Sequence, residues 1–312
     1  MPGLLIGIDV GGTNFRLGVV QGLQVVWEKR FQADFAGLCR KLPSQEATDT
    51  ILSVLNDAVV EARAAYPAVS AIGIGFPGFI DPRSRRVLSS PNLPNLLDAD
   101  IAAPLQSCCS LPVVLENDAS VAAYGEFALG GKTEGDLIYI GLGTGVGGGL
   151  VLNGKLHGGV HGVAMEIGHL IVEPDGRVCG CGNRGCLEQY ASTNGVVQSY
   201  AAQTGITCFA LEVAQLAANR DGAALRAFAL AGEHLAGALA HIVKVIDVEE
   251  VVIGGGMSAS WPLMQIAFER RLQHDLIPAL RGRLNVRLSR AQDRAGIIGA
   301  AMLAGKAVRA AA

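Results

Sequence analysis

The sequence contains the same short pattern twice: an apolar strand, a turn rich in glycine and threonine, and a second apolar strand. The first copy covers residues 4–20 with its turn at Gly11-Gly12-Thr13-Asn14, and the second covers residues 136–154 with its turn at Gly143-Thr144-Gly145. The copies lie about 130 residues apart, which we interpret as an internal duplication of one lobe. We therefore expect a chain made of two related lobes.

Length and composition agree with this expectation. The 312 residues exceed the roughly 100 to 200 of a usual single domain, and a cleft between two lobes is a natural ligand site. Half of the residues are hydrophobic but only 5% are aromatic, so the core must consist mainly of Val, Ile, Leu and Ala. Such a core is typical of α/β proteins with buried parallel strands.

Hydrophobic spacing predicts the remaining elements. The predicted helices cover residues 44–65, 119–127, 211–219, 225–246 and 296 onward, and the further strands cover residues 69–76, 113–115 and 250–253. Beyond the second hairpin we expect helices and only one strand, residues 250–253. The prolines of residues 91–95 predict a loop.

Charge and hydropathy exclude several classes of partner. The net charge of -3 provides no broad basic field for nucleic acid or for an anionic membrane surface. Met1-Pro2-Gly3 leads directly into an apolar run with no basic segment and no cleavage site, so we expect a buried strand and no signal peptide. Elsewhere Gly, His or charged residues interrupt apolar runs before the ~18 residues of a membrane span. We expect a cytoplasmic protein.

Three glycine clusters are candidate phosphate sites, because consecutive amides without a Cβ can approach phosphate oxygens and a threonine hydroxyl can add a donor. They comprise Gly11, Gly12 and Thr13; Gly143, Thr144 and Gly145; and Gly254, Gly255 and Gly256. Each could instead only form a tight turn. The two hairpin turns match neither the P-loop spacing nor the dinucleotide-binding pattern, which opens a helix.

Asp9 ends the first strand, directly before the first turn. A Mg²⁺ ion that bridges ATP phosphates, held directly or through water, would explain a carboxylate at this place. The alternative is an Asp that only accepts hydrogen bonds from turn amides. Arg16 is either a phosphate contact or a surface residue of the returning strand, and the sequence leaves both open.

Asp118 lies where a predicted strand ends and a helix begins, in Glu116-Asn117-Asp118-Ala119. It could be only a helix N-cap. Its functional interpretation is a general base that accepts a hydroxyl proton while that oxygen attacks the terminal phosphate of ATP. Asn117 offers both a donor and an acceptor, which suits a sugar hydroxyl.

Three of the seven cysteines lie within a short glycine-rich loop, at Cys179, Cys181 and Cys186. With His169 they form the ligand set of a closed tetrahedral zinc site, and four protein ligands imply a structural ion. Unliganded core thiols are the alternative. Glu166 and Glu188 flank this loop, where they could accept hydrogen bonds from sugar hydroxyls or simply be solvated.

Seven segments together resemble the ROK family of bacterial sugar kinases and repressors, in order and spacing, over nearly the whole chain. They are Asp9-Val-Gly-Gly-Thr-Asn, Phe76-Pro-Gly, Pro91-Asn-Leu, Glu116-Asn-Asp-Ala, Gly143-Thr-Gly-Val-Gly-Gly-Gly, Glu166-Ile-Gly-His and Cys179-Gly-Cys-Gly-Asn-Arg-Gly-Cys-Leu-Glu. The resemblance implies an α/β, two-lobed, actin-like ATPase fold (ribonuclease H-like), with ATP and sugar in the cleft between the lobes. We accordingly expect a small lobe at residues 1–117 and a larger lobe at residues 118–296. The C-terminal helix, residues 297–312, should pack back onto the small lobe, and the larger lobe should carry the zinc loop.

The resemblance also implies roles for particular residues. Asp118 would be the catalytic base, and zinc would bind His169, Cys179, Cys181 and Cys186. Sugar contacts would come from Asn117, Asp118, Glu166, His169 and Glu188, so His169 would touch both metal and sugar through its two ring nitrogens. ATP and Mg²⁺ are expected at Asp9 and the three glycine clusters.

Three positions, in two segments, depart from the family pattern. Asn14 and Arg16 stand where many family kinases carry Lys and an apolar residue, so no role is carried over to them. Met165 replaces the small residue usual before the Glu, which would narrow the sugar pocket.

The implied activity is phosphorylation of a hexose, with glucose as the leading substrate. Allose, fructose, mannose, N-acetylglucosamine and N-acetylmannosamine remain alternatives, because epimers differ only in the direction of one hydroxyl. The second function class is a sugar-responsive repressor, but family repressors carry a DNA-binding helix-turn-helix before the first phosphate turn. Since eight residues precede Asp9, we expect a kinase. The resemblance also suggests a homodimer.

Overall fold

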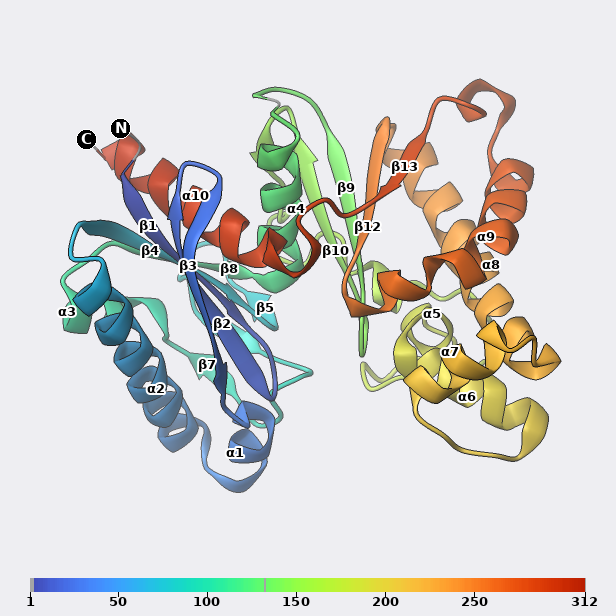
Figure 1. Cartoon of the computed structure of the whole chain (residues 1–312), viewed down its shortest axis with the longest axis horizontal. Coiled ribbons are helices and arrows are strands. Elements are labelled where there is room, and N and C mark those ends of the chain that lie inside the picture. The colour runs from blue at the N-terminus through green and yellow to red at the C-terminus, as the bar shows by residue number, and fades with distance from the viewer. Residues whose placement is uncertain (1–2, 132, 312) are drawn as a thin grey trace. The chain divides into compact units, whose positions relative to one another are not determined.

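The computed structural model describes residues 3–131 and 133–311, and packing divides them into two compact units (Figure 1). Unit 1 comprises the described residues within 1–139, 149–164 and 290–312, and unit 2 comprises residues 140–148 and 165–289. The chain therefore passes from one unit to the other four times. The lobe limits expected from the sequence stay a prediction.

Unit 1 contains a five-stranded sheet in the order β3-β2-β1-β4-β8 and a small sheet, β5-β6-β7. Strand β1 runs antiparallel to β2 and parallel to β4, which is parallel to β8. The strands are β1 (Leu4–Val10), β2 (Asn14–Gln21), β3 (Gln24–Gln32), β4 (Val69–Phe76), β5 (Phe79–Ile80), β6 (Val87–Ser89), β7 (Leu97–Ala99) and β8 (Val113–Asn117). The helices are α1 (Phe35–Lys41), α2 (Ser44–Ala65), α3 (Ala102–Cys109), α4 (Asp118–Leu129) and α10 (Ala295–Ala311), preceded by the 3₁₀ turn η4 (Gln292–Arg294).

The second large sheet has the order β11-β10-β9-β12-β13. Its strands are β9 (Leu137–Leu142), β10 (Val146–Leu152), β11 (Lys155–Leu156), β12 (Glu250–Gly254) and β13 (Asn285–Leu288). The helical elements of unit 2 are η1 (Ile167–His169), α5 (Glu188–Ala191), α6 (Thr193–Thr204), α7 (Ala210–Ala218), α8 (Gly222–Ile246), η2 (Gly256–Ser260), α9 (Trp261–Asp275) and η3 (Pro278–Leu280). Both large sheets place their third, second, first, fourth and fifth strands in that order, which agrees with the predicted duplication.

One expectation about unit 2 is wrong. The sequence predicted a single strand after the second hairpin, but β13 pairs in parallel with β12. Strand β13 has only four residues and lies at a sheet edge, where its side chains are half-buried or exposed. So short a segment gives no clear period of alternation.

Helix α10 packs directly on the backbone of the first sheet. Gly7 on β1 and Gly73 on β4 are paired in register. A Cβ atom at Gly7 would overlap the carbonyl oxygen of Ile297, and one at Gly73 would overlap that of Ala300. The two glycines thus permit a close approach that any side chain would prevent. This contact brings the first turn of α10 near the carboxyl end of β1.

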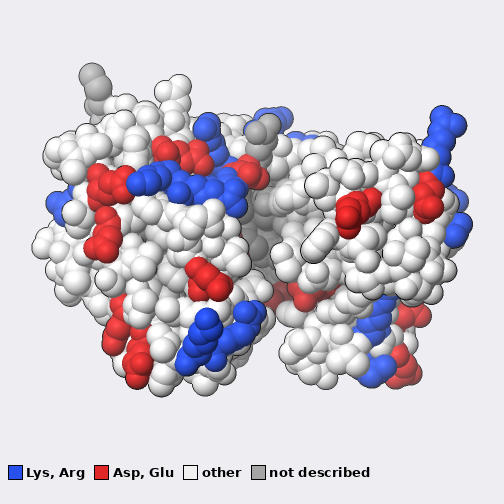
Figure 2. Space-filling model, turned by 60° about the horizontal axis from the view of Figure 1, so that its bottom comes forward, with Lys and Arg blue, Asp and Glu red and all other residues white. Residues whose placement is uncertain are grey.

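Helix α8 is the one helix, among the described residues, that is long and apolar enough to cross a membrane by length and composition. The sequence did not predict such a helix, because charged residues and His interrupt the apolar runs of α8. Its many alanines nevertheless keep the mean hydropathy of the helix high. Half of the relevant stretch is buried, and core helices of soluble proteins meet the same criterion. On the face shown in Figure 2, acidic and basic side chains are interspersed among uncharged surface, in keeping with the small net charge.

Candidate active site

The carboxyl ends of β1, β4 and β8 meet at one edge of the first sheet. Asp9 on β1 is in register with Gly75 on β4, and Gly75 is in register with Glu116 on β8. The first glycine turn therefore leaves the sheet at the same edge as Asn117 and Asp118. In parallel sheets this edge is where ligands usually bind. Within unit 1, the structure thus brings two of the predicted site elements together.

Neighbouring amides hold the first glycine turn in place. The carbonyl oxygens of Gly12 and Thr13 accept hydrogen bonds from the backbone amides of Ala36, at 2.8 Å, and Ala33, at 3.2 Å. The amides of Gly12 and Thr13 themselves donate to no group within the described part of the chain. Their N–H groups are therefore available to an anion, as a phosphate cradle requires.

Asp9 lies half-buried beside this turn and beside the start of α10. A Cβ atom at Gly296 would be 2.7 Å from Asp9 Cγ, so only glycine permits this contact. Burial raises the pKa of Asp9 to about 6, while the charge of Arg16 lowers it and that of Asp293 raises it. The Gly11 amide donates to the Asn14 carbonyl oxygen at 2.9 Å, and no hydrogen bond contributes to the shifted pKa of Asp9, so the alternative role as a turn acceptor has no support among the described residues. A carboxylate without donors suits a hard cation such as Mg²⁺.

Arg16 and Asn14 both have protein partners. Arg16 Nη2 is 2.7 Å from Asp293 Oδ2, and its Nη1 donates to the Asp293 carbonyl oxygen at 3.0 Å. Asn14 Oδ1 accepts a hydrogen bond from Arg30 Nε at 3.1 Å. Arg16 is therefore engaged with the segment that precedes α10.

Asn117, and not Asp118, provides the side-chain cap of α4. Its Oδ1 accepts a hydrogen bond from the Ser120 amide at 3.0 Å, and its Nδ2 donates to the Gly78 carbonyl at 3.1 Å. Asp118 is the first residue of the helix, and its Oδ1 accepts from the Ala119 amide at 2.8 Å. The capping role that could have explained Asp118 thus belongs to its neighbour. The Oδ1 and Nδ2 atoms of Asn117 can each still form one further hydrogen bond.

The second glycine turn rests on Glu188 and Thr193, all within unit 2. Glu188 Oε2 accepts a hydrogen bond from the Val146 amide at 3.2 Å, and a Cβ atom at Gly145 would overlap this carboxylate. The amide and the hydroxyl of Thr193 donate to the Gly143 carbonyl at 2.9 and 3.1 Å. Glu188, predicted as a sugar contact, therefore also supports this turn.

The third glycine cluster lies against the strand that leads into the second turn. Gly255 has a φ of 79°, and a Cβ atom there would overlap the carbonyl oxygen of Leu142. Because Gly143 follows Leu142, the structure brings the second and third clusters together. A side chain at Gly255 would be excluded both by backbone conformation and by space.

Glu166 and His169 lie on and beside η1, with Glu166 Oε2 3.8 Å from His169 Nε2. Burial raises the pKa of Glu166, His169 lowers it, and Glu188 raises it. These three predicted sugar contacts are therefore close enough to interact electrostatically. Met165, directly before Glu166, has a φ of 70°, in the left-handed region that favours glycine.

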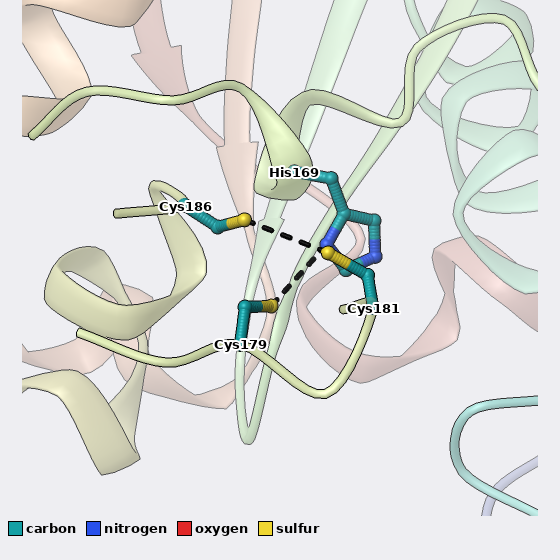
Figure 3. Close-up of side chains that lie close together, drawn as sticks. All are labelled: His169, Cys179, Cys181 and Cys186. Carbon is teal, nitrogen blue, oxygen red and sulfur yellow. Dashed lines mark hydrogen bonds between the residues drawn. The ribbon is translucent and has the colours of Figure 1, made fainter. Parts of the chain in front are cut away.

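The predicted zinc ligands form one cluster (Figure 3). The ligand atoms of His169, Cys179, Cys181 and Cys186 all lie within 4.8 Å of one another, with Cys179 Sγ 3.7 Å from His169 Nδ1. Burial, together with the neighbouring thiols of Cys179 and Cys181, raises the pKa of Cys186 to about 12. A divalent cation would offset the cost of thiolates so close together, so the donor set fits zinc. Nε2 of His169 faces Glu166, which leaves Nδ1 for the cluster.

Three supporting residues were not predicted from the sequence: Glu126, Thr193 and Asp293. Glu126 is fully buried, and its only sequence signal is an acidic residue inside an otherwise apolar helix. Thr193 and Asp293 contact residues 50 and 277 positions away, so no local pattern could have identified them.

Known proteins resemble this chain over nearly its whole length. A sequence model of the ROK family matches residues 5–307. A glucokinase of Streptomyces coelicolor is 32% identical over 97% of this chain and 98% of its own length. An N-acetyl-D-glucosamine kinase of Escherichia coli O1:K1 is 32% identical over 95% of this chain and 98% of its own. The crystal structure of a ROK family glucokinase from Streptomyces griseus in complex with glucose and AMPPNP has a TM-score of 0.79 and 32% identity, covering 97% and 100% of the two chains.

Proposed function

The chain belongs to the ROK family, and on this premise we propose that it is an ATP-dependent kinase that phosphorylates a hexose hydroxyl, with glucose as the leading substrate. The family assignment and the α/β, two-lobed, actin-like fold predicted from the sequence are confirmed by the similarity to family glucokinases. The expected ligand cleft between the lobes stays a prediction.

The observation that carries the proposal is the arrangement at the carboxyl edge of the first sheet. Asn117 caps α4, so Asp118 stands at the helix start without being needed as its cap. We assign Asp118 as the general base. It would accept the proton of the sugar hydroxyl as that oxygen bonds to the terminal phosphorus of ATP and the bond to the ADP oxygen breaks.

Nucleotide binding is proposed at the glycine clusters and Asp9. The first turn offers two amides without protein acceptors, and AMPPNP is bound by the S. griseus glucokinase. Asp9 would hold Mg²⁺, which when bound neutralises phosphate charge. The residues with this proposed role are Asp9, Gly11, Gly12, Thr13, Gly143, Thr144, Gly145, Gly254, Gly255 and Gly256.

Sugar recognition is proposed at Asn117, Asp118, Glu166, His169 and Glu188. The contact between Glu166 and His169 supports the assignment of Nε2 to the sugar side and Nδ1 to a structural zinc ion. The zinc ligands would be His169, Cys179, Cys181 and Cys186, and the ion would fix the loop that precedes Glu188.

The identity of the sugar is the least constrained part of the proposal. A glucokinase and an N-acetylglucosamine kinase are equally similar to this chain, at 32% identity. Glucose leads because Glu116-Asn-Asp-Ala and the cysteine loop look most like the glucokinase branch. The homodimer and the cytoplasmic location stay predictions.

A coupled assay of ADP release over a panel of hexoses tests the proposal. We expect glucose to have the highest kcat/KM, and Asp118→Asn to lower kcat by about 10²- to 10⁴-fold. Equal rates for wild type and Asp118→Asn would contradict the role of the base. A far higher kcat/KM with another hexose would contradict only the choice of glucose.

A further inference from the structure

The segment that enters α10 is held by side chains from three different elements of unit 1. On α4, the fully buried Glu126 carboxylate accepts hydrogen bonds from the amides of Arg290, at 3.3 Å, and Ala291, at 3.1 Å. On β3, Glu28 Oε2 is 2.8 Å from Arg294 Nε. The third contact comes from β2, the strand that pairs with β1.

This third contact is the pair formed by Arg16 and Asp293. The guanidinium binds both the side-chain and the main-chain oxygen of Asp293, at 2.7 and 3.0 Å. Only 19% of the Arg16 side chain is exposed, against 63% for Asp293. A two-point contact made by a mostly buried arginine fixes the backbone of Asp293 and not only its charge.

Asp293 lies in the 3₁₀ turn η4, directly before α10. Helix α10 starts two residues later, and its second residue, Gly296, touches the Asp9 carboxyl group. A Cβ atom at Gly296 would lie 2.7 to 3.0 Å from Asp9 Cγ and from both of its carboxyl oxygens. Asp9 and Arg16 are themselves register partners on β1 and β2. Asp9 is therefore connected to Asp293 in two ways, through its register partner Arg16 and through Gly296 at the start of α10.

We propose that Arg16 and Asp293 are positioning residues for Asp9: their ion pair holds the first turn of α10 against the Asp9 carboxylate and so determines where that carboxylate presents its oxygens to Mg²⁺. This inference rests on the proposed function in so far as Asp9 holds the nucleotide's metal ion. It assigns a role to Arg16, for which the sequence had left a phosphate contact and a surface position open.

A simple effect of charge makes the opposite prediction for one of the two residues. Arg16 and Asp293 both act on Asp9 electrostatically, since they lower and raise its pKa respectively. By charge alone, loss of the Arg16 cation would strengthen Mg²⁺ binding and loss of the Asp293 anion would weaken it. Positioning predicts that both losses weaken Mg²⁺ binding, because either one releases the same contact.

The test is calorimetric titration of AMPPNP at a series of Mg²⁺ concentrations, which requires no turnover. The variants are Arg16→Gln, Asp293→Asn, the double variant and Arg16→Lys. We expect each single neutral variant to raise the half-saturating Mg²⁺ concentration about five-fold, and the double variant to be no worse than the worse single one, because the two residues share one interaction. Arg16→Lys keeps the charge but not the two-point contact, so its effect should be intermediate.

The control is Lys29→Gln, which breaks an exposed ion pair of unit 1, Lys29 to Glu61 at 2.6 Å, that does not touch the segment before α10. It should leave the Mg²⁺ dependence unchanged. Melting temperatures of all variants are measured as well. If Arg16 and Asp293 were only structural, their variants would melt at lower temperature but the folded protein would keep the Mg²⁺ dependence of the wild type.

Three results with the variants would overturn the proposal: opposite shifts for Arg16→Gln and Asp293→Asn, independent effects that multiply in the double variant, or lower stability without a change in Mg²⁺ dependence. A wild-type protein that binds AMPPNP with Mg²⁺ but phosphorylates no hexose would overturn the proposed function and leave this inference testable as described. Binding of AMPPNP that does not depend on Mg²⁺ would overturn the inference itself.

Discussion

Asn117 caps helix α4 by accepting a hydrogen bond from the amide of Ser120 at 3.0 Å. The next residue, Asp118, is thereby placed as the first residue of the helix, at the carboxyl edge of a parallel sheet. The two residues differ in backbone conformation: Asn117 has the extended backbone of a cap, whereas Asp118 is already helical.

Replacement of Asn117 should show how much its capping contact contributes to stability. Asn117→Ala removes the cap and should lower the free energy of unfolding by about 1 kcal/mol, whereas Asn117→Asp keeps an acceptor and should retain most of it. Denaturant unfolding measures both. Equal stability of the alanine and aspartate variants would show that the cap contributes nothing.

Replacement of Gly255 should destabilise unit 2 far more than replacement of its neighbour. Gly255→Ala places a Cβ onto the backbone of Leu142 at a φ of 79°, so we expect a loss of about 2 kcal/mol or more. Gly256→Ala is the matched control, because a Cβ there meets nothing within 4 Å. Thermal unfolding of the two variants decides, and a similar loss in both would contradict the close contact.

Removal of zinc should loosen the cysteine loop. We expect about one zinc ion per chain by elemental analysis, lost in Cys181→Ser together with a lower melting temperature, because binding of a structural ion stabilises the fold directly. Cys108→Ser, which changes an exposed cysteine outside the cluster, should keep the ion. Wild-type protein purified without zinc, and not stabilised by added zinc, would refute the site.

Relief of backbone strain at Met165 should stabilise the protein. A left-handed conformation costs an L-residue about 1 to 2 kcal/mol, and glycine adopts it freely but loses more entropy on folding, so Met165→Gly should gain about 0.5 kcal/mol. Met165→Ala retains the strain and should show no gain. Chemical denaturation compares the two variants. A glycine variant no more stable than the alanine variant would show that the left-handed conformation at this position carries no such cost.

Features encoded by neighbouring residues were predicted well. The hairpin β1–β2, helix α2 and the start of α4 lie where the hydrophobic spacing placed them, and the cysteine loop and His169 converge as the ligand chemistry indicated. In each case the signal is local: a period of two or 3.6 residues, a glycine turn or closely spaced thiols. Strands β3 and β13, by contrast, carry mixed polar and apolar residues at sheet edges and gave no distinct signal.

Sequence by itself thus indicated the glycine turns, the candidate base and the candidate metal ligands of this chain, since turn conformation and ligand chemistry depend on residue type and short spacing. Tertiary structure alone decided that Asn117 takes the capping role beside Asp118, that Gly255 lies on the backbone of Leu142, and that Arg16 binds Asp293. The last two contacts join residues far apart in the chain, and their partners follow from strand register and from how closely glycine lets backbones approach. Neither the strand register nor the distance between two backbones can be predicted from the residues on one side of a contact.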